Sequence, residues 1–254
     1  MSDSIQKLVS EFAGPVVILV RPQMGENIGA AARAMLNCGL YSMRIVAPRD
    51  GWPNEAAIAM ASGAEAILEA AEVFDDLNAA VADLQFVGAT TARDRDMRKP
   101  VVDQTTIAKE LVQRTSIGHK CGLLFGAERS GLENEEVVLA DKLIQVPLNP
   151  VHNSLNLAQA VLLIGYAWFQ LRHNPTLDDG MPTDDLASKD DLENFFARLV
   201  PDLEKSGFLA IEEKKPRMVR NIRNIFQRAS LTKTEVSTLH GIVESLKRLQ
   251  KSAK

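Results

Sequence analysis

The chain has 254 residues, of which 46% are hydrophobic and 24% are charged, and its formal net charge is −4. This length allows one large α/β domain with a small appendage, and a core of that size needs no disulfide bonds or metal ions. The two cysteines, Cys38 and Cys121, match no metal or redox spacing and lie among apolar residues, so we expect both to be buried. Residues 1–12 lack the apolar core of a signal peptide, and we expect a protein of the reducing cytoplasm.

The charge is unevenly distributed along the chain. From Lys205 to the end there are twelve Lys and Arg against four Asp and Glu, a local net charge of +8, so the preceding part carries −12. An imbalance of this size favours contact between the C-terminal part and a polyanion. A solvated helical face gives the same pattern, so the charge alone leaves both readings open.

Apolar, β-rich runs recur along the first 150 residues, with helical spacing in the segments between them. The predicted strands are Val16–Val20, Met43–Val46, Phe86–Val87, Gly122–Phe125 and Leu143–Val146. Runs that are apolar throughout are typical of strands buried on both faces, as in a parallel sheet. We therefore expect an α/β fold with a parallel sheet and helices on both sides.

The first motif begins at Asn27 and ends at Arg33. Asn27 is predicted to be the N-cap of a helix, and the small residues from Gly29 to Ala32 would leave one surface of that helix nearly flat. Arg33 lies about 140° around the helix from the apolar position before Gly29. A guanidinium above a flat surface suits a phosphate or a developing anion, although this motif alone favours a surface arginine on an alanine-rich packing helix.

The second motif, residues 125–132, reads Phe-Gly-Ala-Glu-Arg-Ser-Gly-Leu and is predicted to end a strand and open a helix. Gly126 would let a ligand approach the backbone. Glu128 would stand near the helix N-terminus, where a carboxylate is stabilised whether it has a function or only caps the helix.

The third motif, residues 146–158, combines prolines and asparagines in an irregular loop whose backbone groups can face a ligand. A helix is predicted to begin at Ser154, and an N-cap role alone would explain that residue. Asn156 is different, because an amide on an otherwise apolar helix needs a hydrogen-bond partner.

The helix predicted over Ser154–Leu171 is apolar around almost its whole circumference. Such a helix must be buried on all sides, and burial between the sheet and a second subunit is the arrangement that we expect. Its length and its polar interruptions argue against a membrane span.

Residues 174–185 contain prolines, a glycine and several aspartates and are predicted to be a linker. Three helices follow, opened by a Ser188–Asp191 cap, by Pro216 and by a Thr232–Glu235 capping box. The side chains expected to face inward are Leu192, Phe195, Phe196, Leu199, Leu203, Met218, Ile222, Ile225, Val236, Leu239, Val243 and Leu246. The residues expected to form a phosphate-tracking face are Lys214, Lys215, Arg217, Arg220, Arg223 and Arg228.

In order and content, the three motifs resemble those of the SPOUT methyltransferases, the knotted enzymes that methylate RNA from S-adenosylmethionine. The resemblance covers roughly residues 15–173. Two further features are similar to the TrmJ-type branch, whose members are tRNA (cytidine/uridine-2′-O)-methyltransferases acting at nucleotide 32 of the anticodon loop. These are the segment 87–93, Val-Gly-Ala-Thr-Thr-Ala-Arg, and a C-terminal module that contains Ser206–Phe208, a basic helix ending at Ala229, and Leu239–Ile242.

The resemblance implies a parallel-sheet SPOUT fold with a trefoil knot, plus a small all-α C-terminal extension. It divides the chain into a methyltransferase domain (1–173), a linker (174–187) and a basic helical module that binds RNA (188–254). It also implies S-adenosylmethionine as the cofactor, tRNA as the partner, and a homodimer with the active site at the subunit interface. The four histidines show no metal-ligand spacing, and we assign no metal.

Site residues follow from the matched motif positions. Arg33 would be the principal catalytic residue, binding a phosphate and stabilising the emerging alkoxide, with Glu128, Ser154 and Asn156 shaping the site. The cofactor would be held by Thr90, Thr91, Ala92, Gly126, Val146, Asn153, Ser154 and Leu155, largely through backbone groups.

Three alternatives remain open from the sequence. One is a SPOUT enzyme that methylates another tRNA or rRNA ribose, and a second is a catalytically silent RNA-binding protein that keeps the fold as a scaffold. A dinucleotide-dependent oxidoreductase is the most distant, because residues 25–29 lack the G-x-G-x-x-G spacing.

Overall fold

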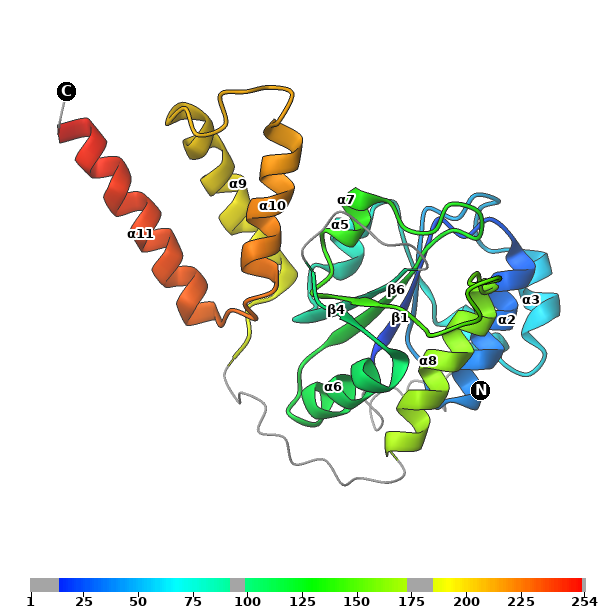
Figure 1. The fold of residues 1–254 in the computed structure, drawn as a ribbon. Helices are drawn as coiled ribbons and strands as arrows, with labels where there is room; N and C mark the ends of the chain where they lie inside the picture. Colours follow the sequence, from blue (N-terminus) through cyan, green and yellow to red (C-terminus); the bar gives the residue numbers. More distant parts are fainter. Residues whose placement is uncertain (1–13, 92–98, 173–184, 253–254) are drawn as a thin grey trace.

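A computed structural model describes residues 14–91, 99–172 and 185–252, and Figure 1 shows a twisted sheet with helices on both faces and three further helices to one side. The sheet has seven strands, all of whose pairings are parallel, in the order β3-β2-β1-β6-β4-β7-β5. In chain order the strands are β1 (Val16–Val20), β2 (Met43–Val46), β3 (Glu72–Phe74), β4 (Phe86–Thr90), β5 (Val101–Val102), β6 (Cys121–Phe125) and β7 (Lys142–Ile144).

Helices of the sheet domain divide between the two faces. Those packed on one face are α2 (Gly25–Asn37), α3 (Glu55–Ala61), α4 (Glu65–Glu69), α6 (Gln104–Ser116) and α8 (Leu157–Arg172). Those on the other face are α5 (Leu77–Val81) and α7 (Asn134–Val137). The helical module consists of α9 (Lys189–Lys205), α10 (Lys215–Gln227) and α11 (Lys233–Ser252).

Burial of both sheet faces explains why the strands are apolar throughout. In β1, Val17 and Leu19 belong to one core and Ile18 and Val20 to the other. Successive residues of a strand point to opposite faces, so both sets of side chains are buried only if helices cover both faces. The predicted parallel α/β fold is confirmed, as is the all-helical C-terminal region.

The start of α2 differs from the prediction. The helix begins at Gly25 with Met24 as N-cap, so the N-cap role expected for Asn27 is wrong. The flat surface of α2 contacts the neighbouring helix α3. A Cβ on Gly29 would lie only 2.2 Å from the carbonyl oxygen of Ala57 in α3. The small residues of α2 therefore allow α3 to pack closely.

Helix α8 packs its buried side against α2 and α6. A Cβ on Gly165 would come 3.1 Å from the Cβ of Cys38, so this glycine permits the close approach. The opposite side is exposed, with Leu162, Leu163 and Tyr166 at 42%, 38% and 52%. One chain thus covers only half of this apolar helix.

The three C-terminal helices have their own apolar core around Phe195, Phe196 and Val236. The Ser188–Asp191 capping box, proline near the start of α10 and the Thr232–Glu235 reciprocal bonds are present as predicted. Two inward positions were predicted wrongly, because Ile225 and Leu246 are 53% and 58% exposed.

The module is joined to the sheet at the first turn of α9. The backbone N–H groups of Lys189 and Asp190 donate to carbonyl oxygens of Leu84 and Ala82. The buried Lys189 Nζ lies 2.5 Å from Oδ2 of Asp141, and it also donates to Oε1 of Gln227 at 2.9 Å. The contact is polar as well as apolar, so it fixes one orientation of α9 against β4 and β7.

In the described ranges, no helix is both long and apolar enough to cross a bilayer. The trefoil knot stays a prediction, because the path of residues 92–98 lies outside the described residues.

Candidate functional site

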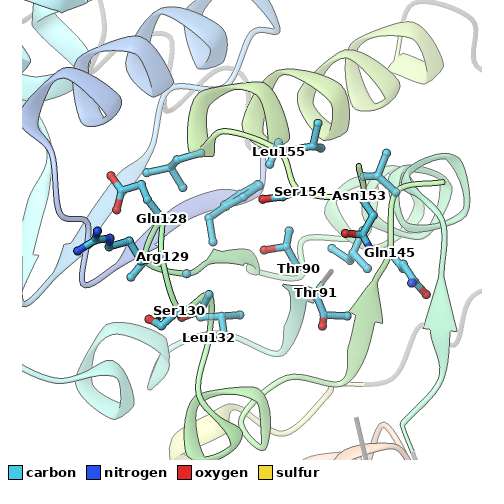
Figure 2. Close-up of a pocket in the computed structure, with 18 of the residues that line it drawn as sticks. Thr90, Thr91, Glu128, Arg129, Ser130, Leu132, Gln145, Asn153, Ser154 and Leu155 are labelled. Atoms are coloured by element: carbon cyan, nitrogen blue, oxygen red, sulfur yellow. Dashed lines mark hydrogen bonds between the residues drawn. The ribbon is translucent and has the colours of Figure 1, made fainter. Parts of the chain in front are cut away.

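A cavity of about 370 Å³ opens where β4, β6 and β7 end, beside the loop that leads into α8 (Figure 2). The carboxyl ends of parallel strands are the usual ligand site of open α/β sheets, because the loops that follow the strands converge there. The described residues that line the cavity are Thr90, Thr91, Phe125–Leu132, Ile144–Val146, Leu148, Asn153–Leu155, Leu157 and Ala160.

The structure brings most of the expected cofactor residues together in this cavity. The lining includes Thr90, Thr91, Gly126, Val146, Asn153, Ser154 and Leu155. Ala92, the remaining one, lies outside the described residues. Figure 2 shows Thr90 and Ser154 on facing walls of the cavity, and the Thr90 hydroxyl donates to the carbonyl oxygen of Leu124 at 2.9 Å. The cavity is thus formed by Thr90 and Thr91 of the segment 87–93 and by the second and third motifs, and the first motif does not line it.

Gly126 has a local role as well. A Cβ at this position would lie 2.3 Å from the backbone nitrogen of Leu132, where the loop folds back on itself. The Gly131 N–H closes that loop by donating to the carbonyl oxygen of Ala127 at 2.7 Å. The glycine thus allows the tight turn that forms one wall of the cavity.

Glu128 binds the beginning of α2. Its carboxylate accepts hydrogen bonds from the backbone N–H groups of Gln23 (2.8 Å) and Met24 (3.3 Å) and from Nδ2 of Asn27 (2.8 Å). A carboxylate at a helix N-terminus is favourable because it meets unsatisfied N–H groups and the positive end of the helix dipole. Its two backbone donors belong to the N-cap residue Met24 and to the residue before it, so Glu128 ties the entry of α2 to the second motif without capping the N–H groups of the helix itself.

Asn156 extends this network to the third motif. Its Nδ2 donates to Oδ1 of Asn27 at 2.8 Å, while its Oδ1 accepts from the backbone N–H of Ala158 at 2.9 Å. Asn156, and not Ser154, thus makes the side-chain bond at the start of α8, which begins at Leu157. The N-cap reading of Ser154 is wrong, and the chain Glu128–Asn27–Asn156 joins the three motifs.

Arg33 is not part of the cavity lining. It is exposed on α2, six residues beyond Asn27, which corresponds to about 9 Å along the helix axis. Within the part of the chain that the structure describes, its guanidinium has no hydrogen bond or ion pair. A single chain therefore does not bring Arg33 together with Glu128, Ser154 and Asn156.

The expected phosphate-tracking face is smaller than predicted. Lys215 pairs with Glu204 at 3.0 Å, and Arg220 pairs with Glu135 of α7 at 3.2 Å. Arg223 pairs with Glu193 and lies 4.6 Å above the ring of Phe196. These three cations are engaged within the protein, so the prediction that they are free for phosphates is wrong.

Two features of the site were not foreseen in the sequence. Asn27 connects the motifs, because its side chain bonds both Glu128 and Asn156. The sequence feature that could have indicated this role is an amide side chain beside the glycines at the start of the helix. Arg129 lies in the cavity wall, and its place next to Glu128 in the second motif was the signal for it. No group of three His, Cys, Asp or Glu side chains suited to a metal occurs within the described ranges.

Two protein-family models match this chain. The model of the SpoU rRNA methylase family matches residues 14–166, and that of the C-terminal domain of the tRNA methyltransferase TrmJ matches residues 190–254. A tRNA (cytidine/uridine/adenosine-2′-O-)-methyltransferase TrmJ from Pseudomonas aeruginosa is 35% identical, over 89% of this chain and 91% of that protein. A tRNA (cytidine/uridine-2′-O-)-methyltransferase TrmJ from Salmonella typhimurium is 34% identical, over 92% and 97%.

Among solved structures, TrmJ from Z. mobilis is 42% identical, with a TM-score of 0.82 over 92% of this chain and 99% of that one. A probable methylase family protein from Haemophilus influenzae is 29% identical, with a TM-score of 0.59 over 94% and 98%. The similarity thus extends over the sheet domain and the helical module together.

Proposed function

Because the chain belongs to the SpoU rRNA methylase family and is of the TrmJ type, we propose that it methylates the 2′-hydroxyl of a tRNA ribose from S-adenosylmethionine. The proposed target is nucleotide 32 of the anticodon loop, carrying cytidine or uridine. The observation that carries the proposal is the cavity at the strand ends, where the matched motif residues converge.

The residues of the cavity fit the cofactor. They provide threonine and serine hydroxyl groups, an asparagine amide and apolar side chains, the mixture that a nucleoside with a polar amino-acid tail requires. When bound, S-adenosylmethionine supplies a methyl group that its sulfonium already activates. The residues proposed to hold it are Thr90, Thr91, Ala92, Gly126, Val146, Asn153, Ser154 and Leu155.

The protein's own task is then to place the ribose and to stabilise charge. Arg33 would bind the adjacent phosphate and stabilise the emerging 2′-alkoxide, and phosphate or water would take the proton, since a guanidinium keeps its own protons. Ser154 would face the reacting groups, and Glu128 and Asn156 would hold the motifs in register through Asn27.

A homodimer would complete the site. Helix α8 exposes Leu162, Leu163 and Tyr166, and α2, against which its other side packs, exposes Leu36 one turn from Arg33. A second copy covering this surface would remove apolar side chains from water and would bring Arg33 of one protomer to the cavity of the other. The proposed interface therefore accounts for the absence of Arg33 from the cavity wall of its own chain.

The direct test is mass spectrometry of tRNA after incubation with the protein and labelled S-adenosylmethionine. The proposal predicts one labelled 2′-O-methylribose, at nucleotide 32. A label at another ribose would keep the reaction and change the target. A protein that binds tRNA and S-adenosylmethionine but transfers no label would be a silent RNA-binding member of the family.

A further inference from the structure

Arg129 lies at the rim of the cavity, in the loop between β6 and α7, and its side chain is exposed. Among the described lining residues it is the one cation, and Glu128 is the one anion. A cation at the mouth of a cavity attracts an anionic polymer electrostatically.

The neighbouring acids do not neutralise Arg129. Glu128 directs its carboxylate to the start of α2, where three donors already engage its two oxygens. In the described part of the chain, the Arg129 guanidinium forms no ion pair or hydrogen bond. This arginine is therefore available to an anion from outside the protein.

Other cations on this side of the sheet are held by carboxylates. Arg49 forms two hydrogen bonds with Asp50, at 2.7 and 3.0 Å, and Arg21 is paired with Glu133 and Glu136. Asp50 and, more weakly, Glu128 raise the pKa of Arg49, so negative charge already surrounds that guanidinium. The contrast leaves Arg129 as the rim cation with no intramolecular partner among the described residues.

The direction of the side chain distinguishes two kinds of anion. In Figure 2, Glu128 and Arg129 extend to one end of the cavity, away from Asn153 and Gln145 at the other end. In the same view the proposed cofactor residues Thr90 and Ser154 lie between Arg129 and Asn153. An anion that meets this guanidinium therefore approaches from outside, as an RNA phosphate does, rather than from within the cavity.

We propose that Arg129 binds a backbone phosphate of the RNA beside the ribose that is methylated. The inference rests on the proposed function, which makes RNA the substrate. A planar guanidinium can bind two phosphate oxygens at once, which fixes orientation as well as distance. Arg129 is thus a substrate-binding residue that places the ribose at the cavity and takes no part in moving the methyl group or the proton.

The test compares wild type with Arg129→Ala, Arg129→Lys and, as a matched surface control, Lys109→Ala on α6, which does not line the cavity. Binding of tRNA to the full-length protein is measured by fluorescence anisotropy at several salt concentrations, and S-adenosylmethionine binding by calorimetry. We expect Arg129→Ala to weaken tRNA binding about tenfold and to reduce the log–log salt slope by about 0.7–0.9.

Kinetic measurements and the conservative variant Arg129→Lys distinguish this binding role from a structural one. We expect the KM for tRNA to rise in Arg129→Ala while kcat changes little, because the phosphate contact exists before methyl transfer. Arg129→Lys should keep the salt slope and recover part of the affinity. S-adenosylmethionine affinity should stay unchanged in every variant, and Lys109→Ala should match wild type.

Two outcomes overturn the inference. If Arg129→Ala loses S-adenosylmethionine affinity and keeps its tRNA affinity and salt slope, the guanidinium binds the cofactor carboxylate instead. If neither ligand is affected, Arg129 binds no anion at this site. Failure of the proposed function is recognised separately, because wild type would then bind tRNA without methylating it, or would not bind it.

Discussion

The Glu128 carboxylate accepts three hydrogen bonds at the start of α2. A substitution that removes its acceptor oxygens therefore leaves these donors without a protein partner. A glutamine keeps one acceptor oxygen and an alanine keeps none. Because the backbone N–H of Gln23 and the amide of Asn27 are both half-buried, water cannot replace every lost bond at full strength.

We therefore expect Glu128→Ala to lower the free energy of unfolding by about 1–3 kcal/mol, and Glu128→Gln to lower it less. Urea denaturation checks both values. The exposed Glu69 at the end of α4 supplies the control, Glu69→Gln, which should stay within about 0.5 kcal/mol of wild type. Equal stability of wild type and Glu128→Ala would show that the α2 contacts contribute nothing.

Arg33→Ala tests the catalytic role of the guanidinium. We expect kcat for methyl transfer to fall by about 10²–10³, because an alkoxide loses its stabilising cation. S-adenosylmethionine affinity should be unchanged, since Arg33 does not line the cavity. Near-normal turnover, or a collapse of cofactor binding in calorimetry, would contradict the assigned role.

At the scale of single residues, positions could be predicted where a motif fixes the backbone, and predictions were wrong where tertiary contacts decide. Ser154 and Asn153 line the cavity as expected, because both belong to one irregular loop. The hydrogen-bond partner at the entry of α2 was missed because it is Glu128, 104 positions beyond Met24 in the chain. Local sequence rules for caps contain no information about a partner at that separation.

At the scale of elements, burial on both faces made the central strands predictable, whereas the edge strands gave no such signal. β3 and β5 are short, and their Val73 and Val101 are 46% and 55% exposed. In α10 the buried positions are Asn224 and Gln227, while Ile225 faces outward. This buried face of α10 is polar because it contacts the charged pair of Lys189 and Asp141. A search for an apolar stripe therefore does not find it.

Lys99 belongs to the same polar region and gives the structure a dependence on pH. Its buried Nζ donates to the carbonyl oxygens of Val138 (2.9 Å) and Ala140. Burial lowers the pKa of Lys99 from 10.5 to about 7. The negative charge of Asp141 partly offsets this shift, whereas the positive charges of Lys189 and Arg223 lower the pKa further. Between these two pKa values the unfolded chain binds more protons than the folded one.

Folding stability should therefore rise as the pH increases from about 7 toward 9. Above that range the buried thiols oppose the trend, since burial raises the pKa of Cys38 from 9.0 to about 11. Urea denaturation at pH 7, 8 and 9 checks the slope, with Lys99→Met as the comparison. The variant should show a flatter pH profile, whatever its absolute stability, and an equal slope in both proteins would contradict the role of Lys99.

At the scale of the whole molecule, the exposed side of α8 presents Leu162, Leu163 and Tyr166 to solvent. We expect a homodimer at micromolar concentration, and Leu163→Arg should convert it to a monomer because a guanidinium would be buried there without a partner. Sedimentation velocity measures both states. Ser237→Arg, at an exposed polar position on α11 outside the proposed interface, is the control. A stable wild-type monomer would falsify the proposed interface.

The helical module should contribute tRNA affinity through cations that the protein does not use itself. Lys214 and Arg228 are exposed, and neither forms an ion pair within the described residues, so we expect Lys214→Ala with Arg228→Ala to weaken tRNA binding. The salt slope should fall by roughly 0.7–0.9 for each lost phosphate contact, with S-adenosylmethionine binding unchanged. An anisotropy titration in which the double variant matches wild type would show that Lys214 and Arg228 do not contact the tRNA.

The contact between Lys189 and Asp141 has a consequence for the order in which the protein is completed during synthesis. The two residues are 48 positions apart, and the aspartate leaves the ribosome first. Until the lysine follows, the carboxylate has the backbone N–H of Val87 as a partner but no counter-charge from α9. The ion pair can form only after translation has passed into the first turn of the helical module, and until then the sheet lacks this link to α9.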